Sequence, residues 1–207
     1  MYADYQSELD YIGQSAVDNV GDANWVKIRL VAQLVGNYLN IEAWYWPAGQ
    51  VQPVAYCCDY EPENADDNGV LDVFENIKWE MYQLKPEEGT WLWATLDIDR
   101  AYEYTVEYDY DNQPEMGAGL INKGEALVDE DYEDEWEDYP RIRPYTPDWW
   151  LEILERNGID VGDTLPESAD DNALVPPSIP PGPEPPPSPQ PTGMPAGIRK
   201  GWHLPNL

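Results

Sequence analysis

Three kinds of residue in this sequence could do chemistry: closely spaced acids, two adjacent cysteines and one histidine. The histidine is His203, near the end of the chain, which excludes a Ser-His-Asp or Cys-His site inside the main body. Cys57 and Cys58 therefore lack a histidine that would activate a thiolate. Adjacent strand residues point to opposite faces, so we predict two reduced thiols, as in a cytoplasmic protein, and no disulfide.

Carboxylates two residues apart are the remaining candidates for acid–base catalysis. Asp97 with Asp99, Glu107 with Asp109 and Asp109 with Asp111 would each share one face of a strand. The chain has 41 acidic residues, so such pairs arise by chance, and no other feature of an active site accompanies them. No Gly-rich phosphate loop follows a strand. We predict no catalytic residues and no enzyme activity, and a hydrolase that uses carboxylates alone is the weakest alternative.

One stretch, NADDNGVLDVFE, has the spacing of an EF-hand calcium loop. The residues at loop positions 1, 3, 5, 6 and 12 are Asn64, Asp66, Asn68, Gly69 and Glu75. Position 1 is normally Asp, and the preceding residues predict a strand where an EF-hand has a helix. We expect a polar turn that caps a helix starting near Val70, with no metal and no cofactor. A calcium- or carbohydrate-binding module is an alternative.

The composition favours a protein partner. The net charge is −30, and phosphate binding depends on Lys and Arg, so nucleic acid and anionic membranes are not expected partners. Ten Trp and fifteen Tyr stand against a single Phe, and these side chains combine apolar area with a polar group, which suits interfaces. No apolar run is long enough to span a bilayer, and the N-terminal residues lack the pattern of a signal peptide. We expect a cytoplasmic protein.

Hydrophobic periodicity predicts the elements that position these residues. An apolar stripe from Tyr2 to Ala16 predicts a helix that ends near Gly21. The further predictions are strands at 25–34, 38–46, 51–58, 90–99 and 102–110 and helices at 70–85 and 146–158. For the last helix we expect Thr146 as N-cap and Gly158 as C-cap. This order predicts an α+β fold: an antiparallel sheet of about five strands with helices packed on one face.

The domain boundary is expected near residue 160. Residues 1–160 form the predicted α+β domain, and residues 161–207 form a Pro-rich tail that is extended or disordered. The tail is most simply a spacer, and an adaptor that recruits a partner through it is a further alternative. The second face of the sheet is predicted to carry five tryptophans: Trp25, Trp44, Trp46, Trp91 and Trp93.

Acidic and aromatic residues interleave in two segments. The first is the end of the last predicted strand: Tyr108, Asp109, Tyr110 and Asp111. The second has eight acids among the ten residues 129–138, and its candidate contact residues are Asp129, Glu130, Asp131, Tyr132, Glu133, Asp134, Glu135 and Trp136. This run has no clean period, so we expect an extended surface segment. Aromatics supply contact area and acids attract a cationic partner.

The order of these motifs resembles the YezG-like immunity proteins of bacterial polymorphic toxin systems. EYDYDNQPE is followed by the acidic run, then by Tyr139-Pro140-Arg141 and by Pro147-Asp148-Trp149-Trp150. The likeness covers roughly residues 1–155. It implies a cytosolic antitoxin that binds and neutralises a cognate toxin, often a nuclease, and it brings no catalytic residues. Together with the charge, it predicts occlusion of a basic toxin enzyme by the acidic-aromatic segments.

Overall fold

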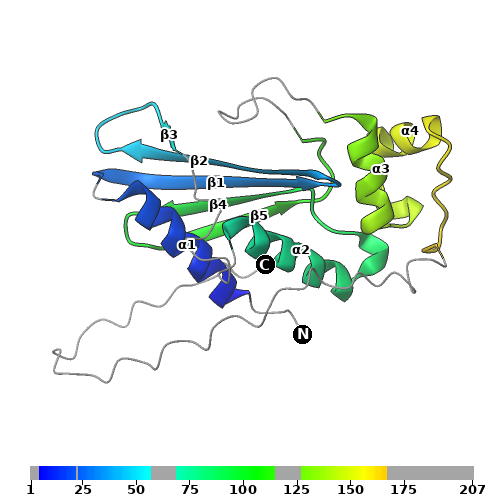
Figure 1. Ribbon diagram of the computed structural model, residues 1–207, viewed down its shortest axis with the longest axis horizontal. Coiled ribbons are helices and arrows are strands. Elements are labelled where there is room, and N and C mark those ends of the chain that lie inside the picture. The colour runs from blue at the N-terminus through cyan, green and yellow to red at the C-terminus, as the bar shows by residue number, and fades with distance from the viewer. Residues whose placement is uncertain (1–4, 22, 57–68, 115–126, 167–207) are drawn as a thin grey trace.

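The computed structural model describes residues 5–21, 23–56, 69–114 and 127–166 (Figure 1). The cysteine pair, residues 64–68 of the calcium-like loop and the Pro-rich tail beyond residue 166 lie outside these ranges. The described helices are α1 (Gln6–Val20), α2 (Val70–Leu84), α3 (Asp129–Asp138) and α4 (Asp148–Arg156), with short 3-10 turns at Pro86–Glu88 and Arg143–Tyr145. None of the helices within the described ranges is long and apolar enough to cross a membrane.

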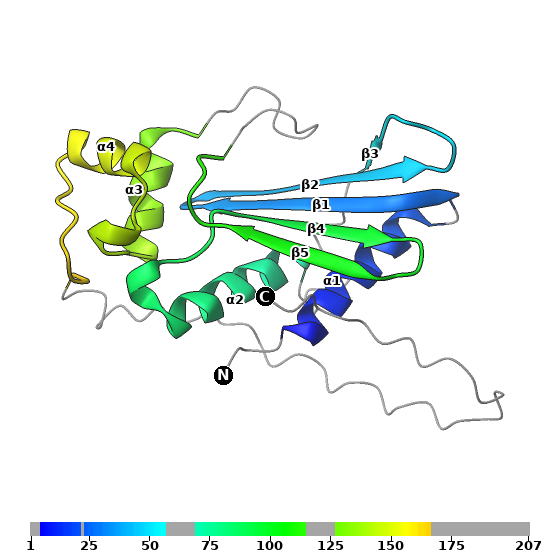
Figure 2. The same ribbon diagram turned by 180° about the vertical axis from the view of Figure 1, so that it is seen from behind.

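The strands form one antiparallel sheet, which confirms the predicted α+β class. They are β1 (Trp25–Val35), β2 (Tyr38–Pro47), β3 (Val54–Tyr56), β4 (Trp93–Asp99) and β5 (Tyr104–Asp109). Their spatial order is β3-β2-β1-β4-β5, with β1 paired to both β2 and β4. Helices α1 and α2 cover one face, whereas α3 and α4 stand at the end of the sheet where β1 finishes (Figures 1 and 2).

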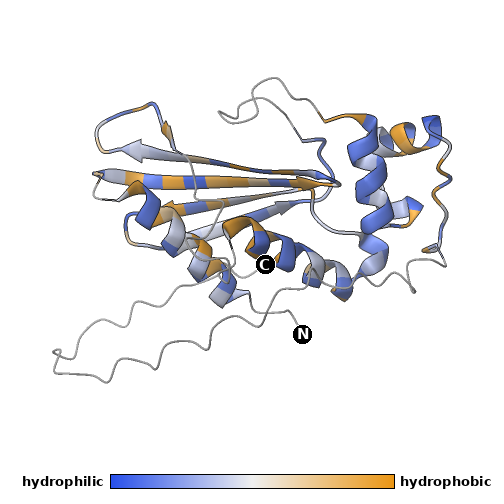
Figure 3. Cartoon of the chain, in the orientation of Figure 1, coloured by the Kyte–Doolittle hydropathy of each residue, from blue (hydrophilic) through white to orange (hydrophobic). Residues whose placement is uncertain are grey.

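The main core lies between the sheet and helices α1 and α2. On α1, the residues Leu9, Ile12 and Ala16 recur every three or four positions and are buried. Alternate residues of the central strands, such as Leu30 on β1 and Leu96 on β4, face them and pair directly across the ladder. Figure 3 shows the apolar side of α2 turned toward the sheet.

Two of the five tryptophans predicted on the second face lie in this core instead. The register between β1 and β2 shifts between Trp25 and Lys27, and this bulge turns Trp25 into the core. Trp91 precedes β4, which begins at Trp93, and its ring packs against Phe74 of α2 with centroids 6.3 Å apart. Trp44, Trp46 and Trp93 are half-buried, and no described helix covers that face.

A second, smaller core joins α3 and α4 to the end of the sheet. It contains Val35, Leu92, Tyr132, Trp150, Ile153, Leu154 and Val161. The predicted tail begins at residue 161, but Val161 is buried in this core and Arg143 N donates to Gly162 O, so the packed residues extend past 160. Helix α4 begins at Asp148, so its N-cap is Pro147 and not the predicted Thr146, whose hydroxyl donates to Ile142 O. Its C-cap is Asn157 and not the predicted Gly158.

Candidate functional site

The structure brings the two predicted acidic-aromatic segments together at one end of the sheet. Trp149 Nε1 of α4 donates to the carbonyl oxygen of Asp111, just beyond β5, at 2.7 Å. Gln113 Nε2 reaches the hydroxyl of Tyr132 on α3 at 3.4 Å. The end of β5 and the acidic run are therefore neighbours in space, although the chain between them is about twenty residues long by sequence number.

The acidic run is a helix, which corrects the prediction of an extended segment. Helix α3 spans Asp129–Asp138, and the Asp131 carboxylate accepts from Val128 N at 2.9 Å at its start. Tyr132 and Glu135 face inward, with 2% and 1% of their surface exposed. The opposite side is wholly acidic and carries the exposed or half-exposed residues Glu130, Glu133, Asp134, Glu137 and Asp138. These five residues, which we call the acidic face, occupy the positions that 3.6 residues per turn bring together.

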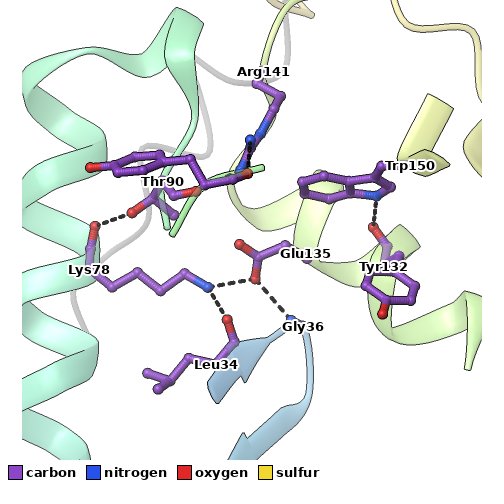
Figure 4. Close-up of polar contacts among 9 residues, drawn as sticks. Leu34, Gly36, Lys78, Thr90, Tyr132, Glu135, Arg141 and Trp150 are labelled. Atoms are coloured by element: carbon purple, nitrogen blue, oxygen red, sulfur yellow. Dashed lines mark hydrogen bonds and ion pairs between the residues drawn. The ribbon is translucent and has the colours of Figure 1, made fainter. Parts of the chain in front are cut away.

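A buried ion pair anchors α3 to the rest of the fold (Figure 4). Lys78 Nζ of α2 lies 2.7 Å from Glu135 Oε2, and the two side chains are 3% and 1% exposed. The same carboxylate oxygen accepts from Gly36 N at 2.9 Å, in the turn between β1 and β2. Lys78 Nζ also donates to the carbonyl oxygen of Leu34. One carboxylate thus joins α3, α2 and the β1–β2 turn, and we call this arrangement the latch.

Burial opposes charge in the latch. It raises the pKa of Glu135 and lowers that of Lys78, while the attraction between the two groups opposes both shifts. Removing either partner would leave the other charge buried and unpaired, which typically costs about 3–5 kcal/mol. The latch therefore fixes the position of α3 strongly once the fold has formed.

The turn between β1 and β2 has no room for a side chain where it meets α3. A Cβ placed on Gly36 would lie 2.3 Å from the carbonyl oxygen of Asp131, and Gly36 has a φ of +53°. Only glycine combines this left-handed backbone with so close an approach. Asp134 also accepts a hydrogen bond from the Asn37 side-chain amide. The hairpin tip and α3 are therefore in direct backbone contact.

Arg141, which follows α3 in the chain, contacts α4 and the end of the sheet. Its guanidinium stacks over the Trp150 ring at 4.6 Å and donates to the carbonyl oxygens of Thr90 at 2.6 Å and Tyr110 at 3.0 Å. Burial lowers its pKa to about 10, so Arg141 stays charged at neutral pH. A Cβ on Gly89 would lie 2.5 Å from Arg141 Nε. Arg141 of the Tyr139-Pro140-Arg141 motif thus connects α4 to Thr90 and to the end of β5.

Contacts with neighbouring elements stabilise helix α3, whereas most of its own charges destabilise it. Glu130 and Asp134, Glu133 and Glu137, and Asp134 and Asp138 are like-charged pairs four residues apart, which destabilise a helix. Its last turn has no basic residue to complement the helix dipole. One exposed ion pair, between Arg156 of α4 and Asp129 at 2.5 Å, opposes this repulsion. The acidic face is therefore held in place mainly by contacts with the rest of the fold.

The predicted contact residues divide into two groups. Tyr132 and Glu135 are withdrawn from the candidate surface because they are buried. Asp109 is occupied by the turn after β5, where its carboxylate accepts from the backbone N–H groups of Asp111 and Asn112. Burial raises the pKa of Tyr108, whose ring packs against Trp91. Tyr108 and Asp109 are half-buried. The other predicted contact residues, all exposed or half-buried, are Tyr110, Asp111, Asp129, Glu130, Asp131, Glu133, Asp134 and Trp136.

Three residues at this site were missed by the sequence reasoning. Glu137 and Asp138 extend the acidic face, and burial raises the pKa of Asp138 with Asp134 adding to the shift. Trp149 is half-buried; its ring stacks on Trp150 at 5.8 Å and contacts Tyr132 edge-on at 5.2 Å. The spacing of Tyr132, Trp136 and Tyr139 by four and three residues, with Glu135 counted as buried, would have indicated a helix and placed Glu137 and Asp138 on its acidic side.

The described carboxylates do not gather into a metal-binding group. Asp97 is engaged by Arg29, through two hydrogen bonds of 2.6 and 2.7 Å, and by Lys27 at 2.8 Å. Within the described ranges, no three potential metal ligands cluster. In the part of the calcium-like loop that is described, Asp72 accepts from Gly69 N at 2.8 Å, and α2 begins at Val70 as expected.

Neither the protein-family models nor the curated proteins provide a relative of this chain. No protein-family model matches this chain. A search of curated proteins found no match either. The resemblance to immunity proteins therefore stays a prediction from its motifs, and the geometry of the site has to support any proposal.

Proposed function

We propose that this chain is an immunity protein that binds a cognate bacterial toxin and blocks its active site. The partner is a protein with a basic cleft, such as a nuclease, and the contact surface is the acidic face of α3 with Asp111 beside it. The chain itself performs no reaction in this proposal. The role matches the expectation from the YezG-like resemblance and rests on the geometry of α3.

The observation that carries the proposal is the rigid presentation of the acidic face. Five acids share one side of a helix whose other side is fixed by the buried Lys78–Glu135 pair. A disordered acidic segment would lose conformational entropy on binding, whereas this helix is already ordered. Preorganised charge also steers a basic partner and raises the association rate, which suits an inhibitor that must act before its target does.

Aromatic side chains beside the acids supply contact area. Trp149 and Trp136 are half-buried at the base of α3, and Tyr110 is half-buried at the end of β5. Trp and Tyr are enriched among the residues that dominate protein interfaces. The proposed contact therefore combines electrostatic attraction at the acidic face with apolar burial at its edge.

The experiment begins with the reading frame next to the gene for this chain. Its C-terminal domain would be expressed alone in a bacterial host, and then together with this chain. The proposal predicts growth arrest by the domain alone and normal growth on co-expression. It also predicts that Glu130→Lys with Glu137→Lys abolishes protection, whereas a matched control on α1 and α2, Asp18→Lys with Glu80→Lys, preserves it. Equal loss of protection by both variants would contradict the role of the acidic face.

A further inference from the structure

The turn between β4 and β5 carries a tyrosine where its geometry favours glycine. Tyr102 N donates to Asp99 O at 3.0 Å, and Asp99 N donates to Glu103 O at 2.9 Å, which defines a three-residue hairpin loop. The last loop position of this turn is left-handed, and glycine is the usual residue there. Tyr102 has a φ of +62° and is the one non-glycine residue in the described ranges with positive φ. A bulky residue in this region is strained.

The strained backbone places the Tyr102 ring beside Trp25 and Arg100. The Tyr102 and Trp25 rings meet edge to face, with centroids 5.9 Å apart and an interplanar angle of 83°. The Arg100 guanidinium lies over the same Trp25 ring, 4.8 Å from its centroid. Trp25 itself is buried, so it forms a fixed base on which the two exposed side chains rest.

Arg100 lacks the carboxylate that the other exposed or half-exposed cations have. Among the described residues, Lys27, Arg29, Lys85, Arg143 and Arg156 each pair with an acid. Arg100 is exposed and flanked by Asp99 and Glu103, yet no described carboxylate pairs with it. Asp99 instead accepts from the backbone N–H groups of Ala101 and Glu103. The planar donors of Arg100 are therefore oriented by Trp25 and available.

We propose that Arg100 and Tyr102, resting on Trp25, form a second docking surface, the turn patch, for a carboxylate-bearing segment of another protein. The carboxylate binds the guanidinium of Arg100 through paired hydrogen bonds, and an apolar side chain next to it packs on the Tyr102 ring. Arg, Tyr and Trp are the residue types that dominate binding energy at interfaces. The turn patch lies at the end of the sheet opposite α3 (Figure 2), so it is independent of the function proposed for the acidic face.

The charge of the chain selects among possible occupants. A net charge of −30 opposes the approach of nucleic acid and of a second copy of this chain. A short segment with one carboxylate has little charge of its own. Its repulsion by the rest of the chain is therefore weak and screened by salt, whereas its contact with Arg100 is direct. The strain at Tyr102 also has an explanation here, because glycine would form the same turn without a ring to offer.

The test uses a library of random twelve-residue peptides displayed on phage and the full chain as target. Peptides would first be cleared on the Arg100→Gln variant, which removes those that bind the acidic face, and then selected on the native chain. We expect the selected peptides to carry Asp or Glu next to an aromatic or aliphatic residue. Their affinity should fall at least about tenfold with Arg100→Gln and stay unchanged with Lys85→Gln, a matched exposed cation.

Tyr102→Gly separates binding from folding. It removes the ring and relieves the left-handed strain, so the lost contact with Trp25 is offset and Tm should stay within about 2–4 °C of the native value. Peptide affinity should fall at least about fivefold. The proposal is overturned if no peptide survives the selection, if the survivors lack a carboxylate, or if Tyr102→Gly leaves their affinity unchanged.

Discussion

The two ends of the sheet carry ion pairs of different kinds. At the α3 end, Lys78 and Glu135 are almost fully buried and joined to the Gly36 backbone. Toward the β4–β5 turn, Asp97 pairs with Lys27 and Arg29 on side chains that are 25–39% exposed. Water screens the exposed pairs and can solvate either charge if its partner is lost. In the buried pair, no water replaces a lost partner. Burial, more than the distance between charges, decides how much each end depends on its ion pair.

The two ends also differ in how many parts of the fold each ion pair or turn connects. The acidic face of α3 depends on the buried latch for its position, since its like-charged pairs four residues apart destabilise the helix. The turn that carries the turn patch is closed by hydrogen bonds within five residues, and its two exposed side chains pack on Trp25. Changes at the α3 end should therefore disturb the whole domain, and changes at the turn end should stay local.

The largest effect is expected when the latch is broken. Glu135→Ala leaves Lys78 buried without a partner and should lower the free energy of unfolding by about 3–5 kcal/mol. The double variant Glu135→Leu with Lys78→Met should recover part of that loss, because no buried charge remains, although Gly36 N and Leu34 O lose their side-chain partners. Urea unfolding of the three proteins measures both values. A loss below about 1 kcal/mol for Glu135→Ala would refute the latch.

The next largest effect is expected for Gly36→Ala, with Gly49→Ala as its matched control. Both positions have positive φ, but an added Cβ meets Asp131 O at 2.3 Å only at Gly36 and meets nothing within 4 Å at Gly49. The control should lose about 1–2 kcal/mol from backbone strain alone. Gly36→Ala should lose about 1–3 kcal/mol more, because α3 must shift. Equal losses in Tm would show that the hairpin tip does not press on α3.

The exposed pairs toward the other end should give a smaller and pH-dependent effect. Burial raises the pKa of Asp97, but the hydrogen bonds from Arg29 and Lys27 outweigh it and hold the pKa below its ordinary value. This stabilisation is present above pH of about 4 and disappears as pH falls through the lowered pKa of the folded state. Asp97→Asn should lose about 1 kcal/mol at pH 7 and nothing at the acid limit. A difference that persists unchanged at pH 2–3 would contradict this assignment.

The smallest effects are expected on the acidic face, and they should differ between the two ends of α3. Glu137 lies in the last turn of α3 and Glu130 in the first. Glu137→Gln removes an unfavourable interaction with the helix dipole and should stabilise the protein by about 0.3–1 kcal/mol, more at low salt. Glu130→Gln removes a favourable one and should stabilise less or destabilise. Thermal unfolding at two ionic strengths compares the pair, and equal shifts would show that the dipole has no part.

Most elements of the fold were predictable because their apolar residues follow a simple period. The exception is α3, where periodicity of apolar residues failed since one core position is Glu135. Counting that acid as buried gives Tyr132, Glu135, Trp136 and Tyr139, a helical stripe. Its partner Lys78 lies 57 residues away, so only the tertiary structure shows that the charge is compensated. Contacts of this kind override local propensity.

Side-chain direction was predictable only where the ladder is regular. The alternation of β1 is right from Ile28 to Leu34 and wrong at Trp25, because a bulge adds a residue that alternation cannot anticipate. The acidic character of the site was visible from composition, while the division of α3 into a buried and an exposed side was not. That division decides which of the predicted contact residues a partner can reach.

The central claim is that the acidic face attracts a basic toxin, and the association rate constant tests it most directly. Stopped-flow binding to the neighbouring gene's toxin domain would be measured at rising ionic strength for the native chain and for two variants of equal charge change. The account predicts that Glu130→Lys with Glu137→Lys slows association at least about tenfold at low salt, with the difference vanishing at high salt. Asp18→Lys with Glu80→Lys should slow it less than about threefold. Equal slowing by both variants, or rates insensitive to salt, would contradict the account.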